Sequence, residues 1–391
     1  MKVFHFLGFL FVLGACTKGS THKGSSSLPI ISIQNLSQER TDSNSVFHLM
    51  ISVNEASNVQ ISVNYSTQDG TAIANKDYVP QSGTLVIAAG QMIGYADIVV
   101  IGDSLRQPPQ SFYLQLSNPV NGSLSNPTGT ATIQNDGTYL PTDTSGYETA
   151  SSYPGYNLIW SDEFNSNSVN TNNWNFETGN SNGWGNNELE YYTSRPQNVF
   201  QSCGHLVIEA RSESYAGSNY TSTRMNTQGK QQFQFGRIDM RAKLPVSSGL
   251  WPALWMLGGN FQQVGWPACG ETDIMELIGT NPNRVVGSIH WAQPGGEGSN
   301  SNTYSLSSGD FSQKFHVFSL IWKQDSMEML VDDQPYMTAN SQNLSGGGTW
   351  PFNSPSFFIF NVAVGGNWPG PPSTATVFPQ RMFVDYVRVF Q

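Results

Sequence analysis

Three carboxylates fall within six residues near the middle of the second half of the chain, at Glu271, Asp273 and Glu276. The residues between them favour β-structure, so the segment 270–276 predicts a strand. Like charges at this density destabilise a buried strand unless a site uses them. Two carboxyl groups that flank a glycosidic bond can hydrolyse it, one as nucleophile and one as acid and base. The spacing therefore indicates a glycosidase site, and a solvated acidic strand or a calcium site is the alternative.

The parity of the spacing decides whether the two glutamates can act together. On a regular strand Glu271 and Asp273 share one face, and Glu276 points to the other. A β-bulge that absorbs one residue near Ile274-Met275 returns Glu276 to the first face. The glutamate Cα atoms are then roughly 13 Å apart and their carboxyls about 5 to 6 Å apart, the separation of a retaining glycosidase. We therefore expect a bulge in this strand.

The environment of the three acids predicts their roles. Glu271, hydrogen-bonded by Asp273, is expected to stay ionised or to share a proton, and to attack the anomeric carbon. Glu276 lies near this negative pair and is partly desolvated by aromatic side chains. Its pKa is therefore expected to be raised, as an acid that protonates a leaving oxygen requires.

Two tryptophans precede the acids on another predicted strand. Trp251 and Trp255 lie four residues apart, so both project from one face. Indole rings suit the apolar faces of pyranoses, and their N–H groups can bond hydroxyls. A single tryptophan is more often a core residue, but this pair favours a sugar-binding platform.

The elements around these residues are strands. Runs at 204–210, 236–242 and 382–389 are typical of β-structure, and no long helical segment interrupts residues 154–391. We expect two large curved sheets packed face to face. Residues 28–137 give shorter alternating runs separated by Gly, Asn and Asp turns, which predict an antiparallel β-sandwich. Between them, residues 138–153 are rich in Thr, Ser, Gly and Pro and predict a linker.

Composition and charge exclude some partners. The net charge of -10 argues against nucleic acid, because phosphate binding needs clustered Lys and Arg. The six histidines suggest no zinc site. We expect a monomer that needs no cofactor for catalysis.

The N-terminus indicates export. Residues 1–15 follow the plan of a signal peptide and end in small residues before Cys16, which resembles a bacterial lipobox. This resemblance implies lipidation of Cys16, a tether at 16–27, and anchoring at the outer membrane or cell surface of a Gram-negative bacterium. Only Cys203 and Cys269 then remain, either paired or free, so no disulfide framework holds the fold.

The run Trp266-Pro267-Ala268-Cys269-Gly270-Glu271-Thr272-Asp273-Ile274-Met275-Glu276 resembles the signature of the laminarinases of glycoside hydrolase family 16. The resemblance extends over residues 154–391, including segments 160–164, 183–188, 249–255, 360–366 and 384–389. It implies a β-jelly roll with a concave catalytic cleft and retaining endo-hydrolysis of β-1,3-glucan. Thr272 departs from the usual aliphatic residue and is expected to face away from the cleft.

The same resemblance implies further site residues. Four would border the groove and hydrogen-bond sugar hydroxyls, with His290 near the leaving-group side: Asn187, Arg224, His290 and Asn361. A structural calcium ion on the convex side would be bound by backbone carbonyls of Glu163 and Gly204 and by the carboxylate of Asp385.

Residues 28–137 resemble the Calx-β domain, an immunoglobulin-like sandwich. Its calcium-binding members hold the ions with carboxylates at one end, and Asp77, Asp103 and Asp136 lie at comparable places, with Glu39 a weaker candidate. The acidic run that usually follows Asp103 is replaced by the segment 104–110. A spacer with little calcium affinity is therefore the favoured interpretation.

Other functions remain open on the same scaffold. One is hydrolysis of mixed-linkage glucan or of a marine galactan, or transfer in place of hydrolysis. Mixed-linkage enzymes of the family usually lack the bulge residue, and galactan enzymes tend to lack the Trp266-to-Gly270 lead-in. Another is a surface receptor that binds glucan without cutting it, but such relatives have generally lost the catalytic acids.

Overall fold

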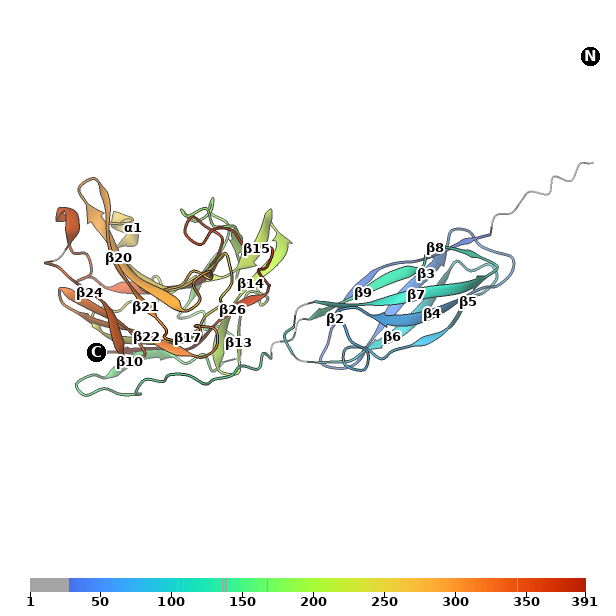
Figure 1. Ribbon diagram of the computed structural model, residues 1–391, viewed down its shortest axis with the longest axis horizontal. Helices are drawn as coiled ribbons and strands as arrows, with labels where there is room; N and C mark the ends of the chain where they lie inside the picture. The colour runs from blue at the N-terminus through green and yellow to red at the C-terminus, as the bar shows by residue number, and fades with distance from the viewer. Residues whose placement is uncertain are drawn as a thin grey trace, which may run out of the picture. The chain divides into compact units, whose positions relative to one another are not determined.

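The computed structural model describes residues 28–391 except 104, 108, 136, 138, 167 and 343. The predicted signal peptide, tether and lipidated Cys16, and also Asp136, lie outside the described residues and stay predictions. The described chain forms two compact units and is built almost wholly of strands (Figure 1). Within this described part, no helix combines the length and apolar character needed to cross a bilayer.

The N-terminal unit is the expected β-sandwich. One sheet has the strand order β6-β3-β1-β8 and the other β2-β9-β7-β4-β5. Alternation along the strands builds its core, because Phe47, Leu49 and Ile51 point inward from β3 while their neighbours are more exposed. Its strands are β1 (Ile30–Ile33), β2 (Leu36–Arg40), β3 (Ser45–Val53), β4 (Ile61–Asp69), β5 (Ser82–Ile87), β6 (Ile93–Val100), β7 (Gln110–Val120), β8 (Ser123–Asn126) and β9 (Thr128–Asn135).

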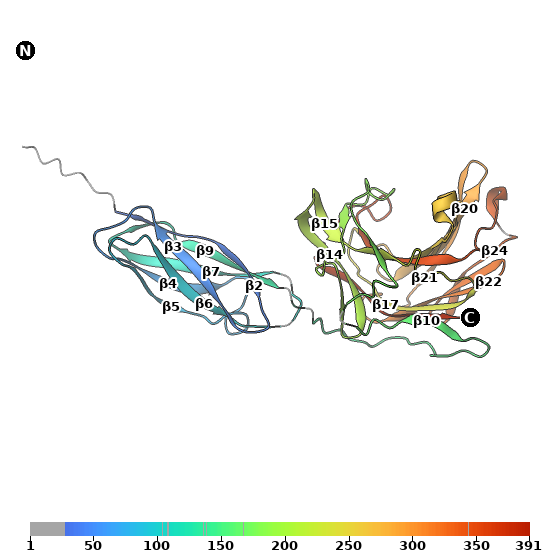
Figure 2. The same cartoon turned by 180° about the vertical axis from the view of Figure 1, so that it is seen from behind.

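The C-terminal unit contains two large sheets, as the sequence predicts. The main path of a 10-stranded sheet runs β12-β15-β14-β26-β17-β22-β23-β24, with β10 and β13 paired beside it. A 7-stranded sheet has the order β11-β16-β25-β18-β19-β20-β21. In both views β15 and β20 rise on opposite sides of this unit (Figure 1, Figure 2).

The elements of this unit have the following bounds: β10 (Leu158–Asp162), β11 (Asn175–Glu177), β12 (Glu190–Tyr192), β13 (Val199–Ser202), β14 (His205–Tyr215), β15 (Ser218–Ser222), β16 (Arg224–Asn226), β17 (Gly236–Lys243), β18 (Leu250–Gly258), α1 (Phe261–Val264), β19 (Glu271–Glu276), β20 (Arg284–Gln293), β21 (Gly296–Ser305), β22 (His316–Lys323), β23 (Ser326–Val331), β24 (Gln334–Asn340), the 3₁₀ turn η1 (Ser345–Gly347), β25 (Ser356–Val364) and β26 (Gln380–Phe390).

Alternation in the central strands separates the core from the functional face. On β25, Phe358, Phe360 and Val362 enter the large core between the sheets. Asn361, from the opposite parity, accepts a hydrogen bond from Trp255 instead. One face of the 7-stranded sheet therefore lines the large core, while the other carries Asn361 and Trp255 beside a small apolar cluster that includes Phe357 and Ile359.

The predicted linker packs against the C-terminal unit. Arg241 is 1% exposed and donates hydrogen bonds to the backbone oxygens of Thr144 and Tyr147, both at 2.7 Å. The hydroxyl of Tyr153 donates to Asp239, also at 2.7 Å. Tyr147 and Thr149 add side-chain hydrogen bonds to Asp333 and Tyr386. Residues 144–153 are thus held by backbone and side-chain contacts, which their Ser- and Gly-rich composition did not indicate. The remaining cysteines are both free, with Cys203 exposed and Cys269 buried.

Candidate active site

The strand β19 contains the expected bulge. In the pairing with β18, Trp255 lies opposite Asp273 and Leu254 opposite Met275, so Ile274 is an extra residue. The pairing with β20 shifts register at the same place, between Asp273 and Glu276. Ile274 and Met275 are both fully buried in the core. Two consecutive inward residues reverse the alternation, which confirms that Glu276 returns to the face of Asp273.

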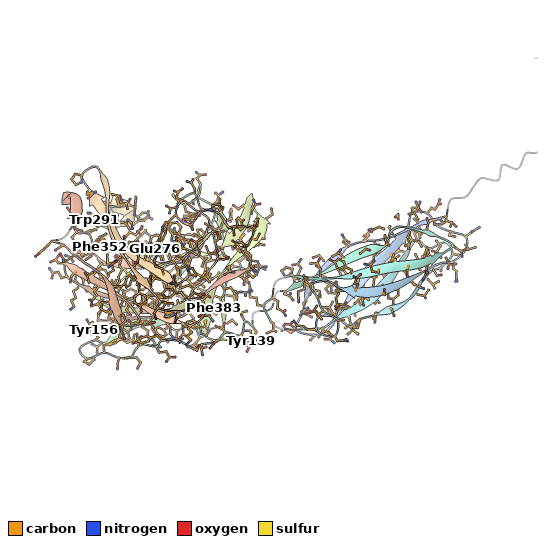
Figure 3. All side chains as sticks on the ribbon, viewed as in Figure 1. Tyr139, Tyr156, Glu276, Trp291, Phe352 and Phe383 are labelled. Atoms are coloured by element: carbon orange, nitrogen blue, oxygen red, sulfur yellow. The ribbon has the colours of Figure 1, made fainter. Side chains whose placement is uncertain are left out.

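A serine on β20 links two of the acids. The Ser288 hydroxyl lies 2.7 Å from Asp273 Oδ2 and 3.2 Å from Glu276 Oε2. Trp251 Nε1 donates to the other Glu276 oxygen at 3.0 Å. Glu276, labelled in Figure 3, is thus held between an indole and a hydroxyl on the functional face.

The third acid lies beside a histidine. Glu271 and His290 are cross-strand partners, with His290 Nε2 3.9 Å from Glu271 and 3.2 Å from Asp273. The other ring nitrogen contacts Glu297. Burial opposes protonation of the ring, but Asp273, Glu271 and Glu297 outweigh it and raise the pKa of His290 to about 10. His290 is therefore a cation at neutral pH, and its closest contacts are to Asp273 and Glu297 rather than to Glu276.

The charge of His290 also bears on the alternative of a metal site. Donor atoms of Glu271, Asp273 and His290 lie within 4.8 Å of one another, the one such group among the described residues. Calcium prefers several hard oxygen ligands, and a protonated imidazole has no lone pair to offer. The group fits an ion-pair network better than a cation site.

Burial and the neighbouring Asp273 raise the pKa values of both glutamates. Burial, with Asp273 next, raises the pKa of Glu276 to about 8. The same two causes raise the pKa of Glu271 well above its usual range. The expected hydrogen bond between Asp273 and Glu271 is not found among the described contacts, because Asp273 is taken up by Ser288 and His290. The two glutamates therefore titrate together, and among the described contacts no hydrogen bond with Asp273 fixes the charge of Glu271.

The expected sugar-binding residues meet on the same sheet. Trp255 Nε1 donates to Asn361 Oδ1 at 2.8 Å, and Asn361 Nδ2 donates to the Tyr192 hydroxyl at 3.2 Å. Arg224 is the cross-strand partner of Asn361 and places its guanidinium carbon 4.8 Å from the centre of the Trp255 ring. The arginine also forms an ion pair with Glu177 at 2.5 Å. These contacts fix Trp255 as one flat wall of the site.

Asn187 lies at the edge of this group. Its side-chain nitrogen donates to Asn367 at 2.8 Å, and its φ of 56° lies in the left-handed region, where asparagine is favoured. Trp368 is 41% exposed, and its ring packs edge to face against that of Trp251, with the ring centres 5.4 Å apart.

Sequence reasoning missed several of these neighbours. Ser288 lies two residues before His290, on the same strand face, and its parity could have revealed it. Trp184 belongs to the quoted segment 183–188 and lies 5.0 Å from Arg224. Four more residues gave no local signal: Glu177, Tyr192, Glu297 and Trp368.

On the convex side, calcium was expected to be bound by backbone carbonyls of Glu163 and Gly204 and by the carboxylate of Asp385, and both acidic side chains are paired with arginines. Glu163 accepts two hydrogen bonds from Arg388 at 2.8 and 2.9 Å, and Asp385 accepts one from Arg241 at 2.7 Å. The second oxygen of Asp385 is 3.6 Å from His205 Nε2. Gly204 adds a backbone carbonyl at most. The one carboxylate of this expected set, that of Asp385, is thus bonded to Arg241, and calcium binding here stays a prediction.

In the N-terminal unit the predicted calcium ligands are likewise dispersed. Asp103 accepts a hydrogen bond from Arg40 at 2.5 Å, and Asp77 accepts one from the Ile73 amide at 2.8 Å. Glu39 is exposed. Among the residues that the structure describes, these acids form no cluster of metal-binding side chains, and calcium binding here stays a prediction.

Two packed sheets that set a buried Asp273 and the partly buried Glu271 and Glu276 beside tryptophans define this protein as a glycoside hydrolase. Residues 166–388 match the model of the Glycosyl hydrolases family 16, and residues 27–137 match that of the Calx-beta domain. The chain therefore belongs to glycosyl hydrolases family 16 and carries a Calx-β domain before its catalytic domain. Both resemblances seen in the sequence are confirmed.

Relatives and solved structures agree with this assignment. The clotting factor G alpha subunit of Tachypleus tridentatus is 39% identical over 239 residues, covering 61% of this chain and 34% of its own length. Glucan endo-1,3-beta-glucosidase A1 of Niallia circulans is 38% identical over 272 residues, covering 63% and 39% respectively. The chain thus spans well under half of these two relatives. The laminarinase catalytic domain of Thermotoga maritima is 47% identical, with a TM-score of 0.57, over 60% of this chain and 98% of that domain.

Proposed function

We propose that this protein is an endo-acting β-1,3-glucanase that retains anomeric configuration, with Glu271 as nucleophile and Glu276 as acid and base. The observation that carries the proposal is the bulge in β19, which turns both glutamates toward one face beside Asp273. The relatives named glucan endo-1,3-beta-glucosidase and laminarinase support β-1,3-glucan as the substrate.

In the first step, Glu271 attacks the anomeric carbon while Glu276 gives its proton to the departing glycosidic oxygen. The Ser288 hydroxyl lies 2.7 Å from Asp273 and 3.2 Å from Glu276 and links the two acids. The negative charge of Asp273 favours the acid form of Glu276. In the second step, Glu276 removes a proton from water, which attacks the anomeric carbon and releases Glu271.

The charges of the site favour this sequence. The imidazolium of His290 lies near Glu271 and Asp273 and offsets the negative charge that Glu271 carries before attack. As Glu271 forms its ester, that charge disappears and Glu276 becomes the anion. One negative charge therefore passes from Glu271 to Glu276, and the total charge of the site does not change.

We expect kcat/KM on laminarin to follow a bell-shaped pH profile. Glu276 must be protonated to act as an acid, and its pKa is raised to about 8. Activity should therefore fall as pH rises through about 8, while protonation of Glu271, whose pKa is also raised, sets the acid limb. Initial rates of reducing-end release measured from pH 4 to 10 check this, and a rate still rising at pH 9 would contradict the role of Glu276.

Replacing Trp255 by alanine is expected to weaken binding more than chemistry. A lost aromatic contact is worth about 0.5–1.5 kcal/mol, so KM for laminarin should rise roughly two- to tenfold with kcat nearly unchanged. Trp255→Phe keeps a flat ring but loses the hydrogen bond to Asn361, and should show a smaller rise. Steady-state kinetics test this, and an unchanged KM in Trp255→Ala removes Trp255 from the sugar site.

One experiment separates the proposed function from its alternatives. The purified chain is incubated with laminarin, lichenan and agarose, and new reducing ends are counted. Release from laminarin, with proton NMR showing the β-anomer first, supports the proposal. If the protein releases more reducing ends from lichenan or agarose, its substrate is that polysaccharide instead. If the α-anomer forms first, the enzyme inverts the anomeric configuration. If laminarin is bound but not cut, the protein is a receptor.

A further inference from the structure

The bulge that the mechanism needs is contacted from the other sheet. The hydroxyl of Tyr336, on β24, donates a hydrogen bond to the backbone oxygen of Ile274 at 3.0 Å. Ile274 is the extra residue of the bulge in β19. Because β24 belongs to the 10-stranded sheet and β19 to the 7-stranded sheet, this hydrogen bond joins the bulge to the opposite sheet.

Tyr336 reaches this position because its own strand is irregular. In the pairing of β23 with β24, Met329 lies opposite Met337 and Leu330 opposite Pro335, so Tyr336 is itself the extra residue. Asn302, on β21, donates a hydrogen bond to the Tyr336 backbone oxygen at 2.7 Å. A second bulge thus aims the ring, and a neighbouring strand fixes its backbone.

Gly287 provides the space for the hydroxyl. In β20 it is the residue between the partners of Asp273 and Glu276, and so it faces the bulge. A Cβ atom here would collide with the Tyr336 hydroxyl and come within 2.6 Å of Met329 Sδ. The space left by the absence of a side chain at Gly287 is therefore occupied by the Tyr336 hydroxyl from β24.

We propose that Tyr336 is a positioning residue for Glu276, and that its hydroxyl holds β19 in the bulged register that turns this carboxyl toward the substrate. Without the hydrogen bond, the Ile274 carbonyl is left unsatisfied in the core, and the strand gains by relaxing toward regular alternation. Relaxation moves Glu276, which follows the bulge, more than Glu271, which precedes it. Burial raises the pKa of Tyr336, with Glu276 and Asp273 adding to the shift, so the hydroxyl stays a donor.

This inference rests on the proposed function, and its test uses two substrates. Hydrolysis of laminarin needs an acid at the leaving oxygen, whereas 2,4-dinitrophenyl β-laminaribioside has a leaving group that departs without one. In Tyr336→Phe we expect kcat/KM on laminarin to fall roughly tenfold to a hundredfold, and kcat/KM on the aryl glycoside to stay within about twofold of the original protein. A role confined to folding would lower both values equally.

Matched variants complete the test. The ring of Tyr304 lies beside that of Tyr336, with the ring centres 6.2 Å apart. Tyr304→Phe removes its hydroxyl and should change kcat/KM on neither substrate. Gly287→Ala displaces the Tyr336 hydroxyl and should reproduce the selective loss, deciding the question if Tyr336→Phe does not fold. Equal losses on both substrates, or no loss on laminarin, in a folded variant overturn the inference. If the original chain cleaves neither substrate, the proposed function itself fails.

Discussion

Glu271→Gln is expected to lower the rate of laminarin hydrolysis by at least about 10⁴-fold, the largest effect of any single substitution. An amide cannot form the covalent bond to the anomeric carbon, although its size and shape match the carboxyl. Reducing-end release over several hours measures the residual rate. Glu328→Gln is a matched control, because Glu328 lies on β23 of the other sheet, and it should retain full activity.

The same substitution should not weaken the fold. Burial and the neighbouring Asp273 raise the pKa of Glu271, so its ionised form destabilises the native state at every pH above its unfolded pKa. Glutamine removes this repulsion. The midpoint of thermal unfolding at pH 7 should therefore stay level or rise while activity disappears, and a substantial residual rate would remove Glu271 as the nucleophile.

The sequence predicted the arrangement of the three acids because that arrangement depends on local parity. The spacing of Glu271, Asp273 and Glu276 is incompatible with a regular strand acting on one substrate, so a bulge could be inferred from three positions. The spacing of Trp251 and Trp255 likewise needed only the period of a strand. Both tryptophans contact members of the site, Glu276 and Asn361.

What the sequence did not predict depends on pairing between distant segments. Glu297 raises the pKa of His290 only because β20 and β21 form a hairpin in one register. Arg241 occupies Asp385 because β17 and β26 are neighbours, so the predicted calcium ligand meets a guanidinium instead. For a related reason, the composition of residues 138–153 did not indicate that the backbone oxygens of Thr144 and Tyr147 bond to that same arginine.

Glu276→Ala should give the second largest effect, a fall of about 10²- to 10⁴-fold on laminarin. The leaving oxygen then departs without a proton, and water attacks the glycosyl-enzyme without a base. On 2,4-dinitrophenyl β-laminaribioside the first step needs no acid, so the glycosyl-enzyme should form rapidly and accumulate. A burst of dinitrophenolate followed by a slow steady rate is the expected record in a stopped-flow trace.

Added azide separates the two glutamates by stereochemistry. In Glu276→Ala, azide needs no base and attacks the α-linked ester to Glu271, forming the C–N bond of a β-glycosyl azide as the bond to Glu271 breaks. In Glu271→Ala, azide replaces the missing nucleophile on the substrate itself and yields the α-glycosyl azide. Proton NMR distinguishes the anomers. If Glu276→Ala gave the α-azide and Glu271→Ala the β-azide, the roles of the two glutamates would be reversed. Absence of rescue in Glu276→Ala, with the burst also lost, would place the acid and base on another side chain.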